Sequence, residues 1–347
     1  MKKLLLATAV AALSVSAAQA APTVYGKAFV TADYVNAERT GTVNDVDNDS
    51  VQVNSNISRL GFKGSEAMTA NTDVIYQLEY GIAIDDSGSE NIGFRSRDTY
   101  LGLDNKNYGQ FRFGRNYSVT DYINNVTVTE GFWDNLGVSN LDMEGDVLDA
   151  VTMADGRRVN NSIVWKAPKY NNLPLELALQ YGADESFVSD SDDRDSGYGA
   201  SLMFDQGTGF TAGVAYEKDM SQAGDLLRGS ATVDLGKYMA APVTLGAMYQ
   251  VADFDGGTED EKGLVVSAEM GLANFARPAA VYLQYNGTKN LAGVDNRDSD
   301  QVVLGGKYMY KDNMIAHAYV GNNSAEDNDS GTDLDVFAIG GGLEYKF

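Results

Sequence analysis

The feature that most constrains this chain is an alternation of apolar and polar residues, which recurs in sixteen stretches separated by turn residues. A period of two gives an extended strand one apolar face and one polar face. In the stretch 23–35, for example, Val24, Ala28 and Val30 share one face, whereas Lys27 and Thr31 share the other. The pattern therefore predicts an all-β protein of many antiparallel strands, each about ten residues long.

The connections between these stretches are of two kinds that alternate along the chain. Some are short, such as NKNY (105–108) and YKDN (310–313), and others are long and rich in Asp and Asn, such as 38–50, 184–195 and 288–300. Short turns at one end and long loops at the other are typical of an up-and-down barrel. An even number of strands places both chain termini at the short-turn end.

Strand length and aromatic residues indicate that this barrel crosses a membrane. A tilted strand of about ten residues spans a bilayer, and Tyr or Phe stands near many strand ends, where membrane interfaces favour these rings. Because hydrocarbon tolerates no open sheet edge, the last strand must pair with the first. A soluble β-sandwich is the alternative, but its apolar faces pack against a second sheet and require no aromatic belts.

The first twenty residues have the pattern of an export signal. Lys2 and Lys3 precede an apolar run from Leu4 to Ala18, and Ala18-Gln19-Ala20 matches a small-residue cleavage site. We therefore expect residues 1–20 to be a signal peptide that is removed after Sec export, leaving residues 21–347 as the barrel. No run of 18 apolar residues follows, so no transmembrane helix is predicted.

Composition argues against several function classes. The net charge of −23 would repel nucleic acid, and the absence of Cys excludes disulfides and Cys-ligated metals. The one histidine, His317, has no evident catalytic partner, so we expect no enzyme activity. The run Asp45–Asp49 resembles the start of a calcium loop, but Ser50 and Asn56 stand where that loop needs Gly and Glu. We therefore predict no metal, no cofactor and no nucleic-acid partner.

One connection is much longer than the others. It covers residues 117–156 and contains Phe132, Trp133 and several acids. A loop of this length within a compact domain is usually functional. Folded into the lumen it would narrow a channel, whereas outside the barrel it would be an acidic flap.

Several motifs in the chain together resemble the general Gram-negative porins, a family of trimeric, sixteen-stranded diffusion channels. The resemblance is carried by VYGKAFV (24–30), SRLGFKG (58–64), RDTYLGL (97–103), YGQFRFGRNY (108–117), TEGF (129–132), GRRVNNSIVWK (156–166) and the terminal EYKF (344–347). It implies a 16-stranded antiparallel transmembrane β-barrel with short periplasmic turns and long acidic extracellular loops. It also implies that the third loop, 117–156, folds into the lumen as a constriction.

The resemblance further implies which residues line that constriction. A basic wall would be formed by Lys27, Arg59, Arg97 and Arg158. Glu130 matches the acidic residue of the family's loop, and Asp121 and Asp134 are two candidates for a second loop carboxylate. The alternation independently places Lys27 in the lumen, and an Arg on the lipid face near mid-membrane would cost several kcal/mol.

Three further residues have roles that the resemblance implies. Arg115 shares its strand face with Phe111 and Phe113, which point outward, and it matches a subunit-contact arginine of a homotrimer. Tyr345 and Phe347 match the C-terminal signal that the barrel assembly machinery recognises. Outer-membrane lipid and lipopolysaccharide are the other expected partners.

The sequence thus predicts an outer-membrane porin of a Gram-negative bacterium. Its water-filled channel would pass small hydrophilic solutes and ions by passive diffusion, with a mild cation preference set by the acidic loops. A substrate-specific channel on the same barrel is the alternative, although no aromatic ladder or dense basic cluster stands out. An adhesin or outer-membrane hydrolase would need a passenger segment or a catalytic cluster, and the sequence shows neither.

Overall fold

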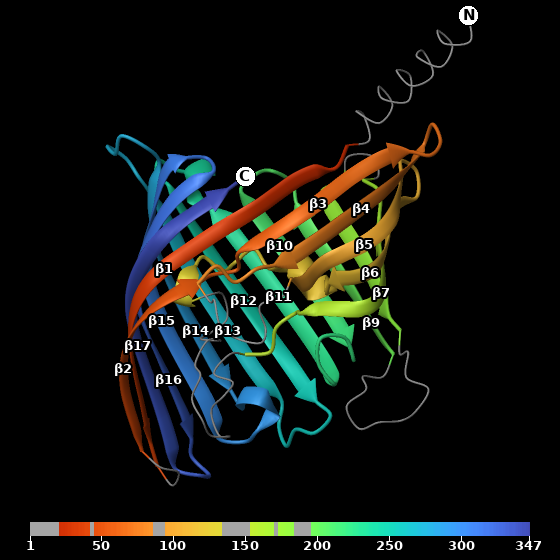
Figure 1. Ribbon diagram of the computed structural model, residues 1–347. Coiled ribbons are helices and arrows are strands. Elements are labelled where there is room, and N and C mark those ends of the chain that lie inside the picture. Colours follow the sequence, from red (N-terminus) through yellow and green to blue (C-terminus); the bar gives the residue numbers. More distant parts are fainter. Residues whose placement is uncertain (1–20, 42–44, 86–93, 134–152, 170–172, 184–195) are drawn as a thin grey trace, which may run out of the picture.

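Seventeen antiparallel strands form one closed sheet in the computed structural model, which describes residues 21–41, 45–85, 94–133, 153–169, 173–183 and 196–347 (Figure 1). The strands are β1(Thr23–Thr40), β2(Val46–Ser55), β3(Arg59–Ala67), β4(Thr72–Gly81), β5(Arg95–Asn105), β6(Gly109–Tyr117), β7(Arg158–Lys166), β8(Leu175–Gly182), β9(Gly197–Asp205), β10(Phe210–Lys218), β11(Gly224–Asp234), β12(Val243–Phe254), β13(Glu261–Leu272), β14(Ala279–Lys289), β15(Arg297–Lys311), β16(Met314–Asp327) and β17(Thr332–Lys346). Short 3-10 helices are η1(Val119–Ile123), η2(Gly131–Trp133), η3(Leu235–Lys237) and η4(Leu291–Gly293). Among the residues described, no helix has the length and apolar character needed to cross a membrane.

The seventeen segments make sixteen barrel strands, because β2 and β3 lie end to end along β1. Val30 pairs with Ser55 of β2, and Lys27 pairs with Arg59 of β3. Ile57, between the two segments, has a φ of 49°, which breaks the extended backbone. Hydrogen bonds still hold this kink against β1, since the Asn56 N–H donates to the Phe29 carbonyl at 2.8 Å. The predicted sixteen-stranded antiparallel barrel is confirmed.

Closure is completed by pairing of the first and last strands. The β1–β17 ladder runs from Lys27 opposite Lys346 to Thr40 opposite Asp333. Beyond it, Gly26 and Phe347 exchange two backbone hydrogen bonds of 2.9 and 3.1 Å. The start of β1 and the C-terminus therefore lie at the same, short-turn end of the barrel (Figure 1).

Side chains alternate between the lumen and the outer surface as the pattern predicts. On β14, Leu283 is 49% exposed, whereas its neighbour Gln284 is 1% exposed. On β15, Val302 and Leu304 are likewise exposed, whereas their neighbour Gln301 is buried. Exposed apolar side chains thus form the outer surface, and polar side chains line the interior, which is the arrangement of a transmembrane barrel.

The strands at the long-loop end extend further than the sequence indicates. The expected loop 38–50 is mostly strand, because β1 continues to Thr40 and β2 begins at Val46. Asp and Asn have low strand propensity, but here they pair across the ladder. Asp49 accepts hydrogen bonds from the Tyr34 hydroxyl and the Asn36 amide, both at 2.9 Å. Many acidic side chains are therefore held on strand extensions.

The third loop leaves β6 and runs along the inner wall of the barrel (Figure 1). Lumen-facing side chains bind its backbone: the Ser230 hydroxyl donates to the Ile123 carbonyl at 2.7 Å, and the Val128 N–H donates to Gln284 Oε1 at 2.7 Å. The Ser267 hydroxyl donates to the loop as well, at the Val126 carbonyl. The loop therefore lies inside the barrel, as predicted.

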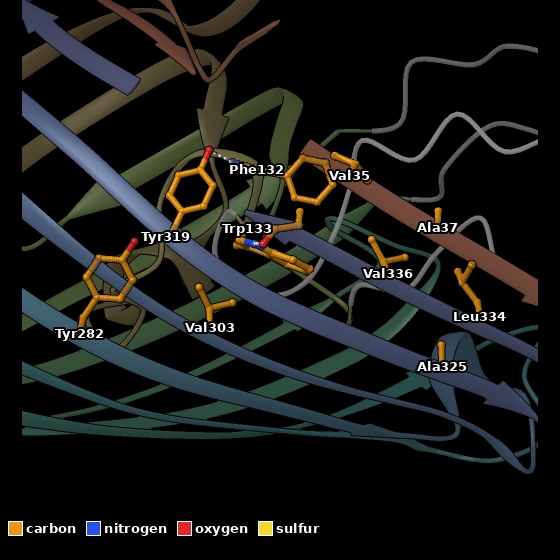
Figure 2. Packing of buried hydrophobic residues seen from close by; sticks show 11 residues of the cluster. Val35, Ala37, Phe132, Trp133, Tyr282, Val303, Tyr319, Ala325, Leu334 and Val336 are labelled. Carbon is orange, nitrogen blue, oxygen red and sulfur yellow. Dashed lines mark hydrogen bonds between the residues drawn. The ribbon is translucent and has the colours of Figure 1, made fainter. Parts of the chain in front are cut away.

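Two aromatic residues of η2 anchor this loop at the seam where the barrel closes (Figure 2). Phe132 and Trp133 are 1% and 0% exposed, and their rings meet edge to face at 5.1 Å. The Trp133 Nε1–H donates to the Ala338 carbonyl at 3.3 Å, and the Phe132 N–H donates to Tyr319 Oη at 3.1 Å. Tyr319 in turn donates to Asp33 Oδ1 at 2.6 Å. The anchor thus contacts β1, β16 and β17 together.

The returning part of the loop is held on the inner wall by residues of β11, β12 and β13. The Ala154 N–H donates to Glu261 Oε1 at 2.6 Å, and its carbonyl accepts from the Gln250 amide at 2.6 Å. Arg228, whose side chain is 0% exposed, pairs with Asp155 at 3.1 Å. Loop residues on both sides of the undescribed stretch 134–152 are therefore fixed to the wall.

Replacement of Trp133 by Ala tests this anchor. Removing a fully buried Trp costs about 3–5 kcal/mol, which should release η2 while leaving the strand ladder intact. We expect larger and noisier single-channel conductance in planar bilayers, with unchanged β-sheet circular dichroism.

Trp165→Ala is the matched control, because Trp165 lies on β7 and alternates with the buried Val164. Its indole donates to the Tyr108 carbonyl and makes no contact with the loop anchor. Equal conductance in the wild type and the Trp133 variant would contradict the anchoring role.

Candidate channel constriction

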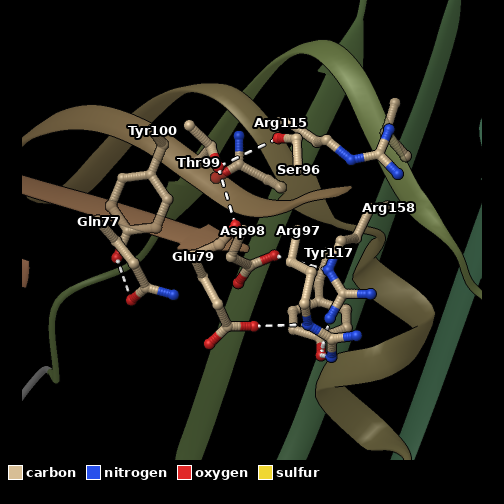
Figure 3. A network of polar contacts seen from close by, with 12 residues as sticks. Gln77, Glu79, Ser96, Arg97, Asp98, Thr99, Tyr100, Arg115, Tyr117 and Arg158 are labelled. Carbon is tan, nitrogen blue, oxygen red and sulfur yellow. Dashed lines mark hydrogen bonds and ion pairs between the residues drawn. The ribbon is translucent and has the colours of Figure 1, made fainter. Parts of the chain in front are cut away.

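Arginines of β3 and β5 contact one carboxylate on the lumen wall, Glu79 of β4, and Figure 3 shows its contact with Arg97. The Arg97 Nε–H donates to Glu79 Oε1 at 2.8 Å, and Arg59 Nε lies 3.7 Å from Oε2. The Tyr25 hydroxyl donates to the same Oε2 at 3.0 Å. Glu79 is 7% exposed, so burial makes each of these contacts stronger than it would be in water.

A β-bulge explains how Arg97 reaches this cluster. Leu78 pairs with Thr99 and Tyr80 pairs with Ser96, so Glu79 alone stands opposite both Arg97 and Asp98. A bulge of this kind re-aims a side chain relative to simple alternation. Both Arg97 and Asp98 therefore make their contacts in the lumen.

Arg158 joins the same cluster from the start of β7. Its Nε lies 3.4 Å from Asp98 Oδ1, and its guanidinium carbon lies 3.9 Å from the centre of the Tyr117 ring. The Tyr117 hydroxyl accepts from Arg158 and also from Arg97 Nη2, the latter at 3.4 Å. A charged guanidinium over an aromatic face is a favourable cation–π arrangement.

The alternation rule alone does not place Arg158. The β6–β7 register shifts between Gly114 and Asn116, and Asn161 adopts a φ of 50°. Because of this irregularity, the alternation of Ser162 and Lys166 does not continue to Arg158, although all three have even numbers in the sequence. The lumen position of Arg158 is shown by its contacts with Asp98 and Tyr117.

Lys27 lies next to the cluster but has different partners. It is opposite Arg59 in the β1–β3 register, yet its Nζ lies 4.0 Å from Glu344 Oε2 of β17. The imidazole Nε2 of His317 lies 3.4 Å from the same oxygen. Lys27 and Glu344 are 6% and 2% exposed, so this second group is a buried ion pair.

The three loop acids have different positions. Glu130 is half-buried on the inward-folded loop, directly before η2. Asp121 lies in η1, where burial and the neighbouring Asp155 raise the pKa of its carboxyl well above the usual range and disfavour its charged form. Asp134 lies outside the described residues.

Sequence reasoning did not single out Glu79, Asp98 or Tyr117, although the structure places all three among the arginines. Glu79 has a weak signal in the sequence, because it shares a strand face with Gln77 rather than with Leu78 and Tyr80. Asp98 has none, since its contact with Arg158 depends on the bulge. The wall therefore carries acidic groups of its own, in addition to those of the loop.

Arg115 stands apart from this cluster (Figure 3). Its Nη1 donates to Asn160 Oδ1, and its Nε has no hydrogen-bond partner among the described residues. The residue lies in the β6–β7 register shift and pairs with Thr99 of β5.

The fold and the narrowed lumen define the class of this protein as a β-barrel channel. The family model described as Gram-negative porin matches residues 7–328. Outer membrane porin N of Escherichia coli (strain K12) is 27% identical over 398 residues, covering 100% of both chains. Outer membrane protein F of Serratia marcescens is 29% identical over 329 residues, covering 83% of this chain and 84% of that protein. Among solved structures, an anion-selective porin from Comamonas acidovorans superposes with a TM-score of 0.68 at 18% identity, covering 94% of this chain and 100% of that chain.

The chain belongs to the Gram-negative porin family. It is a general diffusion porin of the outer membrane and not an enzyme. The resemblance found in the sequence motifs is thereby confirmed.

Neutralising Glu79 tests the electrostatics of the wall. Glu79→Gln keeps an acceptor for Arg97 but removes a negative charge between two arginines. Unit charges about 8 Å apart interact by about 0.5 kcal/mol in water, with opposite sign for cations and anions, so we expect the cation-to-anion permeability ratio to fall about fivefold. The reversal potential under a KCl gradient measures this ratio.

Glu66→Gln is the control, because Glu66 is an exposed residue of the neighbouring β3 and forms no ion pair among the described residues. It should leave the reversal potential unchanged. If both variants behave alike, the cluster around Glu79 does not set the field in the channel.

Proposed function

We propose that this porin selects solutes by size and by a transverse electric field at its constriction. The supporting observation is the arrangement of the lumen, in which a loop fixed to one wall faces a cluster of arginines on another. Such a field aligns dipolar solutes and draws cations and anions to opposite sides, with no bound intermediate. The solutes are small, hydrophilic and carried by passive diffusion.

In this proposal the basic side of the constriction consists of Lys27, Arg59, Arg97 and Arg158. Glu130 supplies the acidic side from the loop, and Asp121 and Asp134 stay as the two candidates for a second loop carboxylate. The raised pKa of Asp121 argues against its carrying a full negative charge.

We also propose a mild preference for cations, set by the long-loop end of the barrel. Exposed carboxylates gather there on the strand ends and in the connections between them, including Asp47, Asp49, Asp253, Asp255, Glu259, Asp260, Asp295, Asp300, Glu326, Asp329, Asp333 and Asp335. Local ion pairs neutralise only some acids of this region, such as Asp225 by Lys218 and Asp327 by Arg297. The excess negative charge concentrates cations at the mouth.

The triple variant Asp253→Asn, Asp255→Asn, Glu259→Gln tests this preference. It removes three exposed carboxylates from the end of β12 and the β12–β13 connection. At 0.1 M salt we expect the cation-to-anion permeability ratio to fall about twofold, as measured by the reversal potential.

The same measurement at about 1 M KCl is the control, because the Debye length shrinks to about 3 Å and screens exposed charges. The difference between variant and wild type should then disappear. An anion-favouring reversal potential in the wild-type protein at low salt would refute the proposal.

We propose a homotrimer in which Arg115 contributes to the subunit contact. Arg115 lies outside the lumen cluster, donates to the neutral Asn160 amide and forms no ion pair among the described residues, so its charge can pair with a group of a neighbouring subunit. Arg115→Ala should weaken the trimer and shift sedimentation in detergent toward the monomer. Arg277→Ala, at an exposed position in the β13–β14 connection, is the control. An unchanged trimer in the Arg115 variant would remove this residue from the interface.

Export and assembly complete the proposal. Residues 1–20 act as the Sec signal, and Tyr345 and Phe347 form the signal for the barrel assembly machinery. Both rings are exposed on the outer surface, at 41% and 55%, and stack at 6.2 Å. Both rings are therefore accessible to the assembly machinery. Lipid and lipopolysaccharide are the other proposed partners of the outer surface. Insertion at the wild-type rate after both rings are replaced by Ala would exclude this role.

A further inference from the structure

A cavity of about 450 Å³ lies at the short-turn end, against the inner wall of β5 to β9. The η1 residue Tyr122 covers it, and side chains of β6, β7 and β9 line it, among them Gln110, Arg112, Lys166 and Ser201. Residues of the β5–β6 and β7–β8 turns form its outer edge. It is separate from the cluster around Glu79, none of whose residues line it.

Two cations in this cavity have no carboxylate partner. Gln110 pairs with Lys166 and Arg112 pairs with Val164, so Arg112 and Lys166 are diagonal neighbours on the lumen face. Within the described part of the chain, neither has a carboxylate oxygen within 4.0 Å. The arginines of the constriction, by contrast, contact Glu79 or Asp98.

Aromatic rings hold both cations in place. Lys166 Nζ lies 3.7 Å from the centre of the Tyr122 ring, and the Arg112 guanidinium carbon lies 4.6 Å from that of Tyr100. The Arg112 Nε–H also donates to Gln110 Oε1 at 2.6 Å. These contacts position the cations but do not neutralise them, because a ring or an amide carries no net charge.

The lining of the cavity carries more cations than carboxylates. Glu176 pairs with Lys169 at 2.9 Å, whereas Asp104 Oδ2 accepts from the neutral Gln110 amide at 3.3 Å and keeps its charge. The lining cations are Lys106, Arg112, Lys166 and Lys169, so the two carboxylates offset only part of the positive charge.

Tyr122 contributes its ring to this cavity and not its hydroxyl. The hydroxyl is inaccessible to solvent and therefore does not open into the cavity. The ring lines the cavity and lies against Lys166, so it positions this cation without reducing its charge.

We propose that this cavity is a subsite for a small oxyanion, such as a carboxylate or phosphate solute, on the periplasmic side of the constriction. Arg112 and Lys166 supply the charge, and the rings of Tyr100 and Tyr122 hold these two cations in place. The guanidinium fork matches two oxygens of such an anion. The inference rests on the proposed channel function, since the anion would be a solute in transit.

The subsite refines the selectivity of the channel. The acidic mouth favours cations overall, whereas an anion that has passed the constriction meets an excess of positive charge at the exit. Retention there lowers the current carried while the site is occupied. The expected signature is a saturable block by oxyanions in a channel that conducts KCl normally.

Inorganic phosphate is the probe for the test. Single channels in bilayers of neutral phosphatidylcholine are recorded in KCl while phosphate is added to one side at a time. We expect a saturable decrease in conductance, at lower phosphate concentration from the short-turn side. Arg112→Gln and Lys166→Gln should each raise the half-blocking concentration about tenfold. Tyr122→Phe, which keeps the ring against Lys166, should leave it unchanged.

Lys307→Gln is the matched control. Lys307 also lies over a tyrosine ring in the lumen, 5.3 Å from the centre of Tyr282, but it is paired with Glu269 at 3.1 Å. This variant should keep the wild-type phosphate block. Phosphatidylcholine headgroups carry no net charge, so they do not compete with phosphate as anions. A block that appears only after anionic lipid is added would assign the site to lipid headgroups and overturn the solute subsite.

The outcomes separate this inference from the channel function itself. Normal KCl conductance with no phosphate block, or an equal loss of block in Lys307→Gln and Lys166→Gln, overturns the subsite and leaves the channel function standing. Absence of conductance in the wild type overturns the channel function.

In that case the subsite is tested independently, by titration calorimetry of phosphate binding in detergent. Equal phosphate affinity of the wild type and the Arg112 variant also refutes the subsite.

Discussion

The pairing of β1 with β17 is the constraint on which the rest of this structure depends. In hydrocarbon, each unpaired backbone N–H or C=O costs several kcal/mol, so a sheet of this size is stable only when it closes. Closure is tight here because Gly340, Gly341 and Gly342 of β17 lie against β1 and β16, where a Cβ would meet neighbouring backbone or the Asp33 carboxylate. The closed ladder then provides the rigid inner wall on which loop and charges are arranged.

The charges of the lumen are organised in two ways. Around Glu79 and Asp98, cations and carboxylates contact each other directly, so part of their field is cancelled locally. At the short-turn end, Arg112 and Lys166 are held by neutral groups and keep their field. The difference follows from which strand neighbour faces each cation, and it gives one barrel regions of different electrostatic character.

Most of the architecture could be predicted from the sequence, because alternation and strand length are local properties. Irregularities of the backbone could not. The bulge at Glu79, the kink at Ile57 and the register shift before Asn116 depend on how neighbouring strands pair, which the alternation within one strand does not determine. The same holds for the contact of Lys27 with Glu344, which requires closure of the barrel. Site residues in regular strands were therefore accessible to sequence reasoning, and their partners were not.

The anchor of the third loop has a consequence for the order of assembly. Tyr319 of β16 joins Phe132 to Asp33 of β1, and Trp133 binds a carbonyl of β17. This docking surface does not exist until the first and last strands have met. A nascent barrel that is still open at the seam therefore has no place for the loop, and its lumen narrows only as the final step of folding. The constriction thus reports on the completion of the barrel that contains it.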